Sequence, residues 1–226
     1  MKNLLAIVLL LPLSVPLFAQ SERTTDFGTI AAVELEVSLP ANFGLSVEEE
    51  LRFHHNCVQF DRWLNSLGMD YTCWHNRMNL GLTLDYIRRY NDKDYFENRC
   101  RLGLQATYTE TYRRFKFQLR SKLLGTFLDE TIGEYRMNPR LYWRNRLKAT
   151  YQPMNSRFKY GLSTELFWLT NDPKGSYVDN IRTVASVEYR LTRRYFLMAF
   201  VQMNNELQVK EPVDQFLFGL TFSAKY

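Results

Sequence analysis

Apolar and polar residues alternate along the chain from Val33 almost to its end. In the segment 78–86, for example, every second residue is Met, Leu or Tyr, and the residues between them are Asn, Gly, Thr and Asp. Successive side chains of a β-strand point to opposite faces of the sheet, so this period of two predicts strands with one apolar and one polar face. The pattern is found in eleven segments: 30–40, 43–53, 62–72, 78–90, 95–108, 113–123, 139–151, 157–169, 180–191, 195–205 and 215–226.

The connections between these segments are alternately short and long. The short ones are 40–42, 73–77, 109–112, 152–156 and 192–194, and the long ones include 54–61, 124–138, 170–179 and 206–214. In a membrane barrel, tight turns gather at one end of the strands and long loops at the other. The sequence therefore predicts an all-β fold, an antiparallel up-and-down transmembrane β-barrel.

The first nineteen residues have the layout of a secretory signal peptide. Lys2 supplies a positive start, an apolar run follows over 4–18, and the small residue Ala19 ends it. The run is short and interrupted by two prolines, so a retained N-terminal helix is the less favoured alternative. We expect cleavage after Ala19, with residues 1–19 as the signal peptide and 20–226 as a barrel in the outer membrane of a Gram-negative bacterium.

A tyrosine recurs at the end of every second predicted strand. The five tetrapeptides that carry it are Gly68–Tyr71, Gln105–Tyr108, Lys148–Tyr151, Ser186–Tyr189 and Ser223–Tyr226, and the tyrosines are 37, 43, 38 and 37 residues apart. Each spacing corresponds to one hairpin. The tyrosines are therefore expected at one level of the barrel, where an aromatic girdle marks the interface of a bilayer. The alternative is a tyrosine-rich soluble sheet.

The last predicted strand ends on an aromatic residue, in the pattern Phe218-x-Leu220-x-Phe222-x-Ala224-x-Tyr226. This ending resembles the signal that the barrel assembly machinery of the outer membrane reads, and Phe222 and Tyr226 are its expected residues. The motifs VELE at 33–36, LSVEEELR at 45–52 and RNRL at 144–147 resemble an uncharacterised family of Gram-negative outer-membrane β-barrels, a domain of unknown function. The resemblance implies the fold and the location, and it implies no activity.

The number of strands does not follow directly from the eleven segments. Barrels of this kind are usually even-numbered, with both termini on the periplasmic side, whereas eleven strands would leave the N-terminus among the long loops. Residues 21–29 could add a short strand, or they could thread through the lumen. We expect twelve strands, with ten as the second choice.

Charged residues are almost confined to the polar face, which lines the lumen in a membrane barrel, because a lipid-facing Lys or Arg costs about 2–4 kcal/mol at the midplane of the bilayer. Acids predominate in the first four predicted strands and bases in the fifth to the ninth. An acidic wall is therefore expected to face a basic wall. The candidate lumen-lining residues are Glu34, Glu36, Glu48, Glu50, Arg99, Arg101, Arg114, Lys116, Arg120, Arg140, Arg144, Arg146 and Arg182.

Two functions fit this arrangement of charge. The first is a small pore or transporter for anionic or amphipathic solutes, because some of the positive charges lack partners. The second is a non-conducting structural or partner-binding barrel, in which acids such as Glu48 pair with bases such as Arg144 across the lumen. The segment Tyr195–Val201 is apolar on both faces. Its inward row is expected to pack against a plug or the threaded N-terminus, or else to form an apolar wall for a ligand.

Signals for catalysis are weak. The three histidines are His54 and His55 after the second strand and His75 in a turn, so they assemble no triad with a nucleophile. A surface hydrolase that pairs His54 with Asp61 is a distant alternative. We expect no enzyme activity and no cofactor.

The histidines and cysteines also bear on metal binding. His54, His55 and Cys57 could bind a soft metal, but a solvated loop is the preferred interpretation, and no metal site is expected. Three cysteines are an odd number for an exported chain and argue against a disulfide framework. The expected partners are the lipids of the outer membrane and, during biogenesis, the assembly machinery. Nucleic acid is not expected as a partner, and the barrel is expected to be a monomer.

Overall fold

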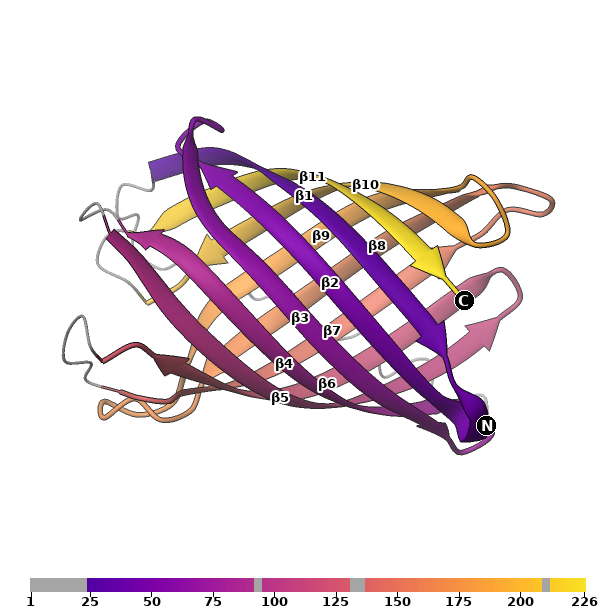
Figure 1. Ribbon diagram of the computed structural model, residues 1–226, viewed down its shortest axis with the longest axis horizontal. Coiled ribbons are helices and arrows are strands. Elements are labelled where there is room, and N and C mark those ends of the chain that lie inside the picture. Colours follow the sequence, from indigo (N-terminus) through magenta and orange to yellow (C-terminus); the bar gives the residue numbers. More distant parts are fainter. Residues whose placement is uncertain (1–23, 92–94, 131–136, 209–211) are drawn as a thin grey trace.

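The computed structural model describes residues 24–91, 95–130, 137–208 and 212–226. In this part of the chain, no helix is long and apolar enough to cross a membrane. The segment 1–19, expected to be a signal peptide, lies outside the described residues. The elements are shown in Figure 1: β1 (Thr24–Ser38), the 3-10 turn η2 (Pro40–Asn42), β2 (Phe43–His54), β3 (Gln59–Cys73), β4 (Met78–Asn91), β5 (Tyr95–Tyr112), β6 (Phe115–Leu128), β7 (Arg140–Tyr151), β8 (Phe158–Leu169), β9 (Tyr177–Arg190), β10 (Tyr195–Glu206) and β11 (Val213–Lys225).

The eleven strands close into a single barrel in the order of the sequence. Strands that are consecutive in the chain pair antiparallel, and β1 pairs with β11 in parallel, from Thr24 opposite Val213 to Glu36 opposite Lys225. The parallel pair follows from the odd number, because the first and last of eleven strands in a meander run in the same direction. The expected all-β barrel is confirmed, and the expected number of twelve strands is one more than the structure has.

The difference in strand number comes from the residues before Ile30. They extend β1 back to Thr24 and pair with β11, with Gly28 opposite Leu217, instead of forming a further strand. Two connections also differ from the expectation. The β2–β3 connection spans only 55–58, and β5 continues to Tyr112, so that the turn before β6 consists of Arg113 and Arg114.

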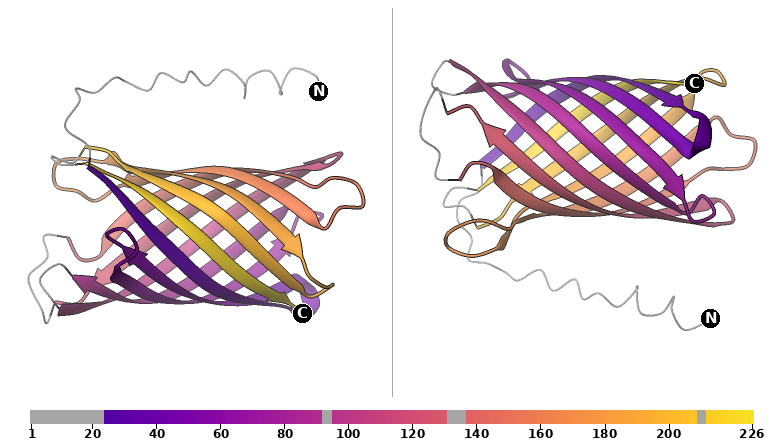
Figure 2. Two further views of the ribbon diagram at one scale, coloured as in Figure 1. Left: turned by 90° about the horizontal axis from the view of Figure 1, so that it is seen from above. Right: turned by 60° about the horizontal axis from the view of Figure 1, so that its bottom comes forward.

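The barrel has two different ends, and its strands are strongly inclined as they wrap around the interior (Figures 1 and 2). The turn end carries the C-terminus and the connections β1–β2, β3–β4, β5–β6, β7–β8 and β9–β10. The loop end carries Thr24 and the connections β2–β3, β4–β5, β6–β7, β8–β9 and β10–β11.

Apolar side chains cover the outside of the barrel, and charged side chains are buried inside it. Outward leucines on several strands expose more than half of their surface, among them Leu84, Leu104, Leu123 and Leu162. The buried charged side chains include Arg52, Asp85, Glu97, Lys122 and Glu165. This distribution is the reverse of that in a soluble protein, in which charged groups are rarely fully buried.

Aromatic rings gather near both ends of the barrel. At the turn end, ring pairs with centroids 4.8–6.0 Å apart join neighbouring strands and turns: Phe43–Tyr71, Trp74–Tyr108, Phe115–Tyr151, Phe158–Tyr189 and Tyr195–Phe222. At the loop end, the pairs are Phe27–Phe216, Phe60–Phe96 and Trp143–Trp168. The hydroxyl of Tyr226 lies 3.0 Å from that of Tyr195, so all five tyrosines of the repeat lie at the turn end.

The apolar inward row of β10 packs against the wall of the barrel itself. Phe200 lies opposite Gly219 of β11, and its ring occupies the space where a Cβ of residue 219 would be. Phe200 and Met198 share the interior with Ile30 and Ala32 of β1. The partner of this row is therefore the seam between β10, β11 and β1. The alternative in which residues 21–29 thread through the lumen is wrong for residues 24–29, because they form the start of β1 in the barrel wall; residues 21–23 lie outside the described part.

Candidate functional site in the charged lumen

The lumen holds cavities at three levels. The loop-end cavity has a volume of about 670 Å³, the middle cavity about 310 Å³ and the turn-end cavity about 650 Å³. Arg144 and Arg182 line both the loop-end and the middle cavity. These two cavities therefore meet at the side chains of β7 and β9.

Arginine dominates the loop-end cavity. Its charged lining consists of eight arginines, Arg52, Arg62, Arg89, Arg99, Arg101, Arg140, Arg144 and Arg182, and four carboxylates, Asp26, Asp61, Asp179 and Glu206. The arginines come from six strands, each from a position at which the alternation turns the side chain inward. A concave surface with an excess of one charge raises the local concentration of the opposite ion. The loop-end cavity is therefore suited to anions.

Several of these arginines are only partly paired. The Nη2 atom of Arg101 lies 3.1 Å from Asp85 Oδ2, and the Nε atom of Arg89 lies 3.3 Å from Asp61 Oδ1. Five other N–H groups are buried and donate no hydrogen bond to a described residue, namely Nε of Arg52, Arg62, Arg99, Arg101 and Arg140. Buried donors in folded proteins nearly always have a partner. The described residues therefore do not use all the hydrogen-bond donors of these arginines.

Glu165 joins two arginines where the loop-end and middle cavities meet. Its Oε1 accepts a hydrogen bond from Arg120 Nη2 at 2.6 Å, and its Oε2 accepts one from Arg144 Nη2 at 2.8 Å. The guanidinium groups of Arg144 and Arg182 lie 4.2 and 4.8 Å from the ring centroid of Phe167. Burial of Glu165 is therefore compensated by two charge-assisted hydrogen bonds, the strong kind.

The acidic residues gather on β1 and β2, toward the turn end. Glu34 and Glu48 lie directly opposite each other in the β1–β2 ladder. Glu34 accepts a hydrogen bond from Ser223, and Glu36 forms an ion pair of 2.7 Å with Lys225. The charged residues that line the turn-end cavity are all acidic: Glu34, Glu36 and Asp70. The lining of the turn-end cavity is therefore acidic, whereas that of the loop-end cavity is mainly basic.

The structure places eleven of the thirteen candidate lumen residues on the three cavities. Arg99, Arg101 and Arg140 line the loop-end cavity, Glu48, Glu50, Arg120 and Arg146 the middle one, Glu34 and Glu36 the turn-end one, and Arg144 and Arg182 the first two. The prediction that Arg114 lines the lumen is wrong, because this residue lies exposed in the β5–β6 turn. Lys116, the second residue of β6, is also exposed and lines none of these cavities.

The expected ion pairs across the lumen are also corrected. In the described part of the chain, none of Glu34, Glu36, Glu48 and Glu50 pairs with Arg114, Arg120, Arg144 or Arg146. Glu50 instead pairs with Arg52 of its own strand at 3.0 Å, and Arg120 and Arg144 share Glu165. Side chains on neighbouring positions of one wall meet more easily than side chains on opposite walls.

Sequence reasoning missed Arg62, Arg89 and Asp179 as residues of the loop-end cavity. Both Arg62 and Asp179 lie near the loop end of a strand. Arg62 is the first residue of the predicted segment 62–72, and Asp179 lies one residue before the predicted segment 180–191. Arg62 and Arg89 lie within the predicted segments 62–72 and 78–90, and following the inward series of each segment to its loop end would have found them.

Of the remaining predicted positions, His54, His55 and Asp61 line the loop-end cavity, and the others line none of the three cavities. Cys57, Cys73 and Cys100 are free thiols. His75 lies in the β3–β4 turn, at the opposite end of the barrel from His54 and His55. Phe222 and Tyr226 lie at the turn end, where the backbone of Tyr226 accepts a hydrogen bond from Ser38 and donates one to Glu36. The C-terminal residue thus takes part in closing the barrel.

Comparison with known families gives one match. The profile of a family described as a protein of unknown function (DUF2490) matches residues 27–215, from β1 into β11. No curated protein matches the chain.

Proposed function

The chain belongs to the DUF2490 family of proteins of unknown function, and we propose that it is an outer-membrane β-barrel that admits small anionic solutes into its lumen from the loop end. The observation that carries the proposal is the lining of the loop-end cavity, in which eight arginines face four carboxylates. Small solutes with carboxylate or phosphate groups are the substrate class, because guanidinium groups bind both in a bidentate manner.

The outer surface supports a place in a membrane. Its strands have 12–18 residues, more than the roughly 9–11 that a tilted strand needs to cross the hydrocarbon core. Exposed leucines form the middle of that surface, and aromatic pairs lie near both ends. An apolar band between two aromatic girdles is the outer surface of membrane barrels. Glu49, an acid on the outer face of β2, accepts a hydrogen bond of 2.8 Å from Trp63 Nε1, which reduces the cost of its position.

Fractionation tests the location. The protein should be recovered with the outer membrane, and its gel mobility should change on boiling, because a closed barrel resists unfolding by detergent. Recovery in the soluble periplasmic fraction would contradict the proposed location in the outer membrane.

Planar-bilayer recording tests the function. Purified protein should give discrete conductance steps with anion selectivity, and added inorganic phosphate should reduce the chloride current by occupying the loop-end cavity. Steps with cation selectivity would contradict an anion pathway.

A non-conducting barrel is the second candidate, and one observation favours it. Glu165, Arg120, Arg144 and the ring of Phe167 form a connected cluster between two cavities, and Phe200 occupies the interior beside them. If these groups block the passage, bilayers should stay silent while phosphate still binds to the purified barrel. This combination would assign the loop-end cavity to binding and not to transport.

A further inference from the structure

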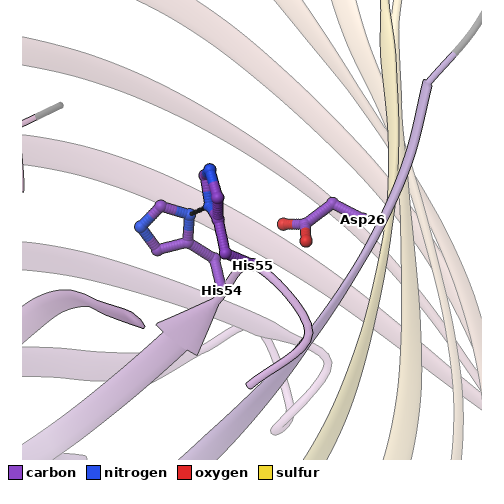
Figure 3. A group of neighbouring side chains, drawn as sticks. All are labelled: Asp26, His54 and His55. Carbon is purple, nitrogen blue, oxygen red and sulfur yellow. Dashed lines mark hydrogen bonds between the residues drawn. The ribbon is translucent and has the colours of Figure 1, made fainter. Parts of the chain in front are cut away.

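Three potential metal ligands meet at the rim of the loop-end cavity. Asp26 of β1, His54 at the end of β2 and His55 in the following turn each offer one donor atom, and these atoms lie within 4.8 Å of one another. Figure 3 shows the carboxylate of Asp26 directed toward the two imidazole rings. Asp26 and His54 are 28 positions apart in the sequence, and the β1–β2 pairing brings them together.

The backbone explains how two consecutive histidines face each other. In a strand, the side chains of residues 54 and 55 would point to opposite sides of the sheet. His55, however, is the first residue after β2 and has a left-handed conformation, with φ of 51°. This turns its ring back toward His54, and the ring centroids lie 4.3 Å apart.

Hydrogen bonds already hold the turn against β1. The backbone N–H of Asn56 donates to Asp26 Oδ1 at 3.3 Å, and that of Cys57 donates to the carbonyl oxygen of Phe27 at 3.2 Å. Gln215 Nε2 lies 3.4 Å from the other oxygen of Asp26. Such contacts to a carboxylate fix the orientation of a ligand before a metal arrives.

The contact between the two rings has the chemistry of a metal site. The Nδ1 atoms of His54 and His55 face each other at 2.5 Å, so one of them must carry a proton for the other to accept. A metal ion bound to both nitrogens would replace that proton. The Nε2 atom of His54 is buried and has no hydrogen-bond partner among the described residues, which leaves the second nitrogen of this ring without a competing role.

We propose that Asp26, His54 and His55 bind one divalent transition-metal ion of the Zn²⁺, Ni²⁺ or Cu²⁺ class. Imidazole nitrogen and carboxylate oxygen suit these ions, whereas Mg²⁺ and Ca²⁺ prefer oxygen ligands alone. For Zn²⁺, ligand distances of about 2.0–2.2 Å place neighbouring donors roughly 3.4 Å apart. Small side-chain rotations bring the three donors to that spacing. Three protein ligands leave one tetrahedral position open toward other ligands, and the ion would link the first strand of the barrel to its first loop.

Equilibrium dialysis with Zn²⁺ tests the site in untagged, full-length protein folded in detergent micelles. We expect one bound zinc per chain and the loss of this binding in His55→Gln and in Asp26→Asn. His75→Gln and Cys57→Ser are matched controls, because His75 occupies a left-handed turn position at the opposite end and Cys57 lies in the same turn outside the ligand set. Both controls should keep one bound zinc. The boiling-dependent gel shift of each variant checks that it has folded.

Two results would overturn the proposal. One is the absence of stoichiometric zinc, nickel and copper binding in the wild-type barrel. The other is undiminished binding in folded His55→Gln and Asp26→Asn. Loss of zinc in Cys57→Ser alone would move the site to the exposed thiol and also contradict the assignment. These outcomes are independent of anion conductance, which the same variants can be used to measure separately.

Discussion

Phe200 of β10 packs its ring over Gly219 of β11, the residue directly opposite it in the ladder. The glycine makes room for the ring, because a Cβ at this position would overlap three of the ring's carbon atoms. The pair fills part of the interior beside the middle cavity. A glycine on one strand and a large aromatic residue on the next thus determine how much of the lumen stays open at this level.

Gly219→Ala should therefore destabilise the barrel. The new methyl group must displace the Phe200 ring, and overpacking of this kind costs about 1–3 kcal/mol. Urea unfolding of the folded protein in lipid vesicles measures the loss, and Phe200→Leu in the same chain should recover part of it. Gly125→Ala is the control, because the nearest heavy atom to its added Cβ is 3.5 Å away. Equal stability of the two alanine variants would contradict this packing.

Glu165→Gln should also destabilise the barrel, because it leaves Arg120 and Arg144 close together without their shared carboxylate. Removing one partner of a fully buried ion pair costs about 3–5 kcal/mol, and less where water reaches the site. Glu188→Gln is the matched control. Its partner Lys159 is more exposed, with 38% of its side-chain surface accessible against 11% for Arg144. An equal loss of unfolding free energy in both variants would mean that the Glu165 cluster is as hydrated as the surface.

Glu48→Gln should behave differently from Glu165→Gln. The sequence alone suggested that Glu48 pairs with Arg144, in which case its loss would destabilise the fold. In the structure Glu48 lies opposite Glu34, and like charges directly opposite each other in a ladder are unfavourable. We therefore expect unchanged or slightly higher stability on urea unfolding, and a smaller gain when Glu34→Gln is added. A clear loss of stability would restore the pairing inferred from the sequence.

Removal of Tyr226 should impair closure of the barrel more than a change of its side chain. The backbone of Tyr226 bonds to both Ser38 and Glu36 of β1, at 2.7 and 2.9 Å. Deletion removes both bonds, whereas Tyr226→Phe keeps them and the ring, and loses only the contact with the Tyr195 hydroxyl. The amount of boiling-sensitive, folded protein in outer-membrane fractions measures the difference. Equal levels of the deletion and the wild type would contradict roles in both closure and assembly.

The alternation of residues was sufficient to locate the eleven strands of the described residues, because nearly every strand has one polar and one apolar face. It was insufficient for the ends of the strands. The segment Thr24–Thr29 belongs to β1 although it contains Gly28 on the inward side, where the side chain of Leu217 takes the space. The alternation continues through the tight turn at Arg113 and Arg114. The turn was therefore predicted too early, at 109–112, and Arg114 was assigned to the lumen.

The pairing of strands far apart in the chain could not be predicted from the sequence. The alternation does not show that β1 and β11 pair in parallel, and twelve strands were expected because membrane barrels usually have an even number. The same limit applies to the side chains. The inward position of Arg120, Arg144 and Glu165 follows from the period of two, but their mutual contacts depend on register. Asp26 escaped notice beside His54 and His55 because the start of β1 was not recognised.

The reversal potential across a planar bilayer under a KCl gradient tests the central claim most directly, which is that the arginines of the loop-end cavity select anions. The reversal potential of the wild-type barrel should have the sign expected for chloride selectivity. The double variant Arg99→Gln, Arg140→Gln should shift this potential toward zero. Arg88→Gln serves as the control, because Arg88 lies on the outer face, stacked on Phe96 at 4.5 Å, and its loss should leave the potential unchanged. A cation-selective potential in the wild type, or equal shifts in the control and the double variant, would contradict the account.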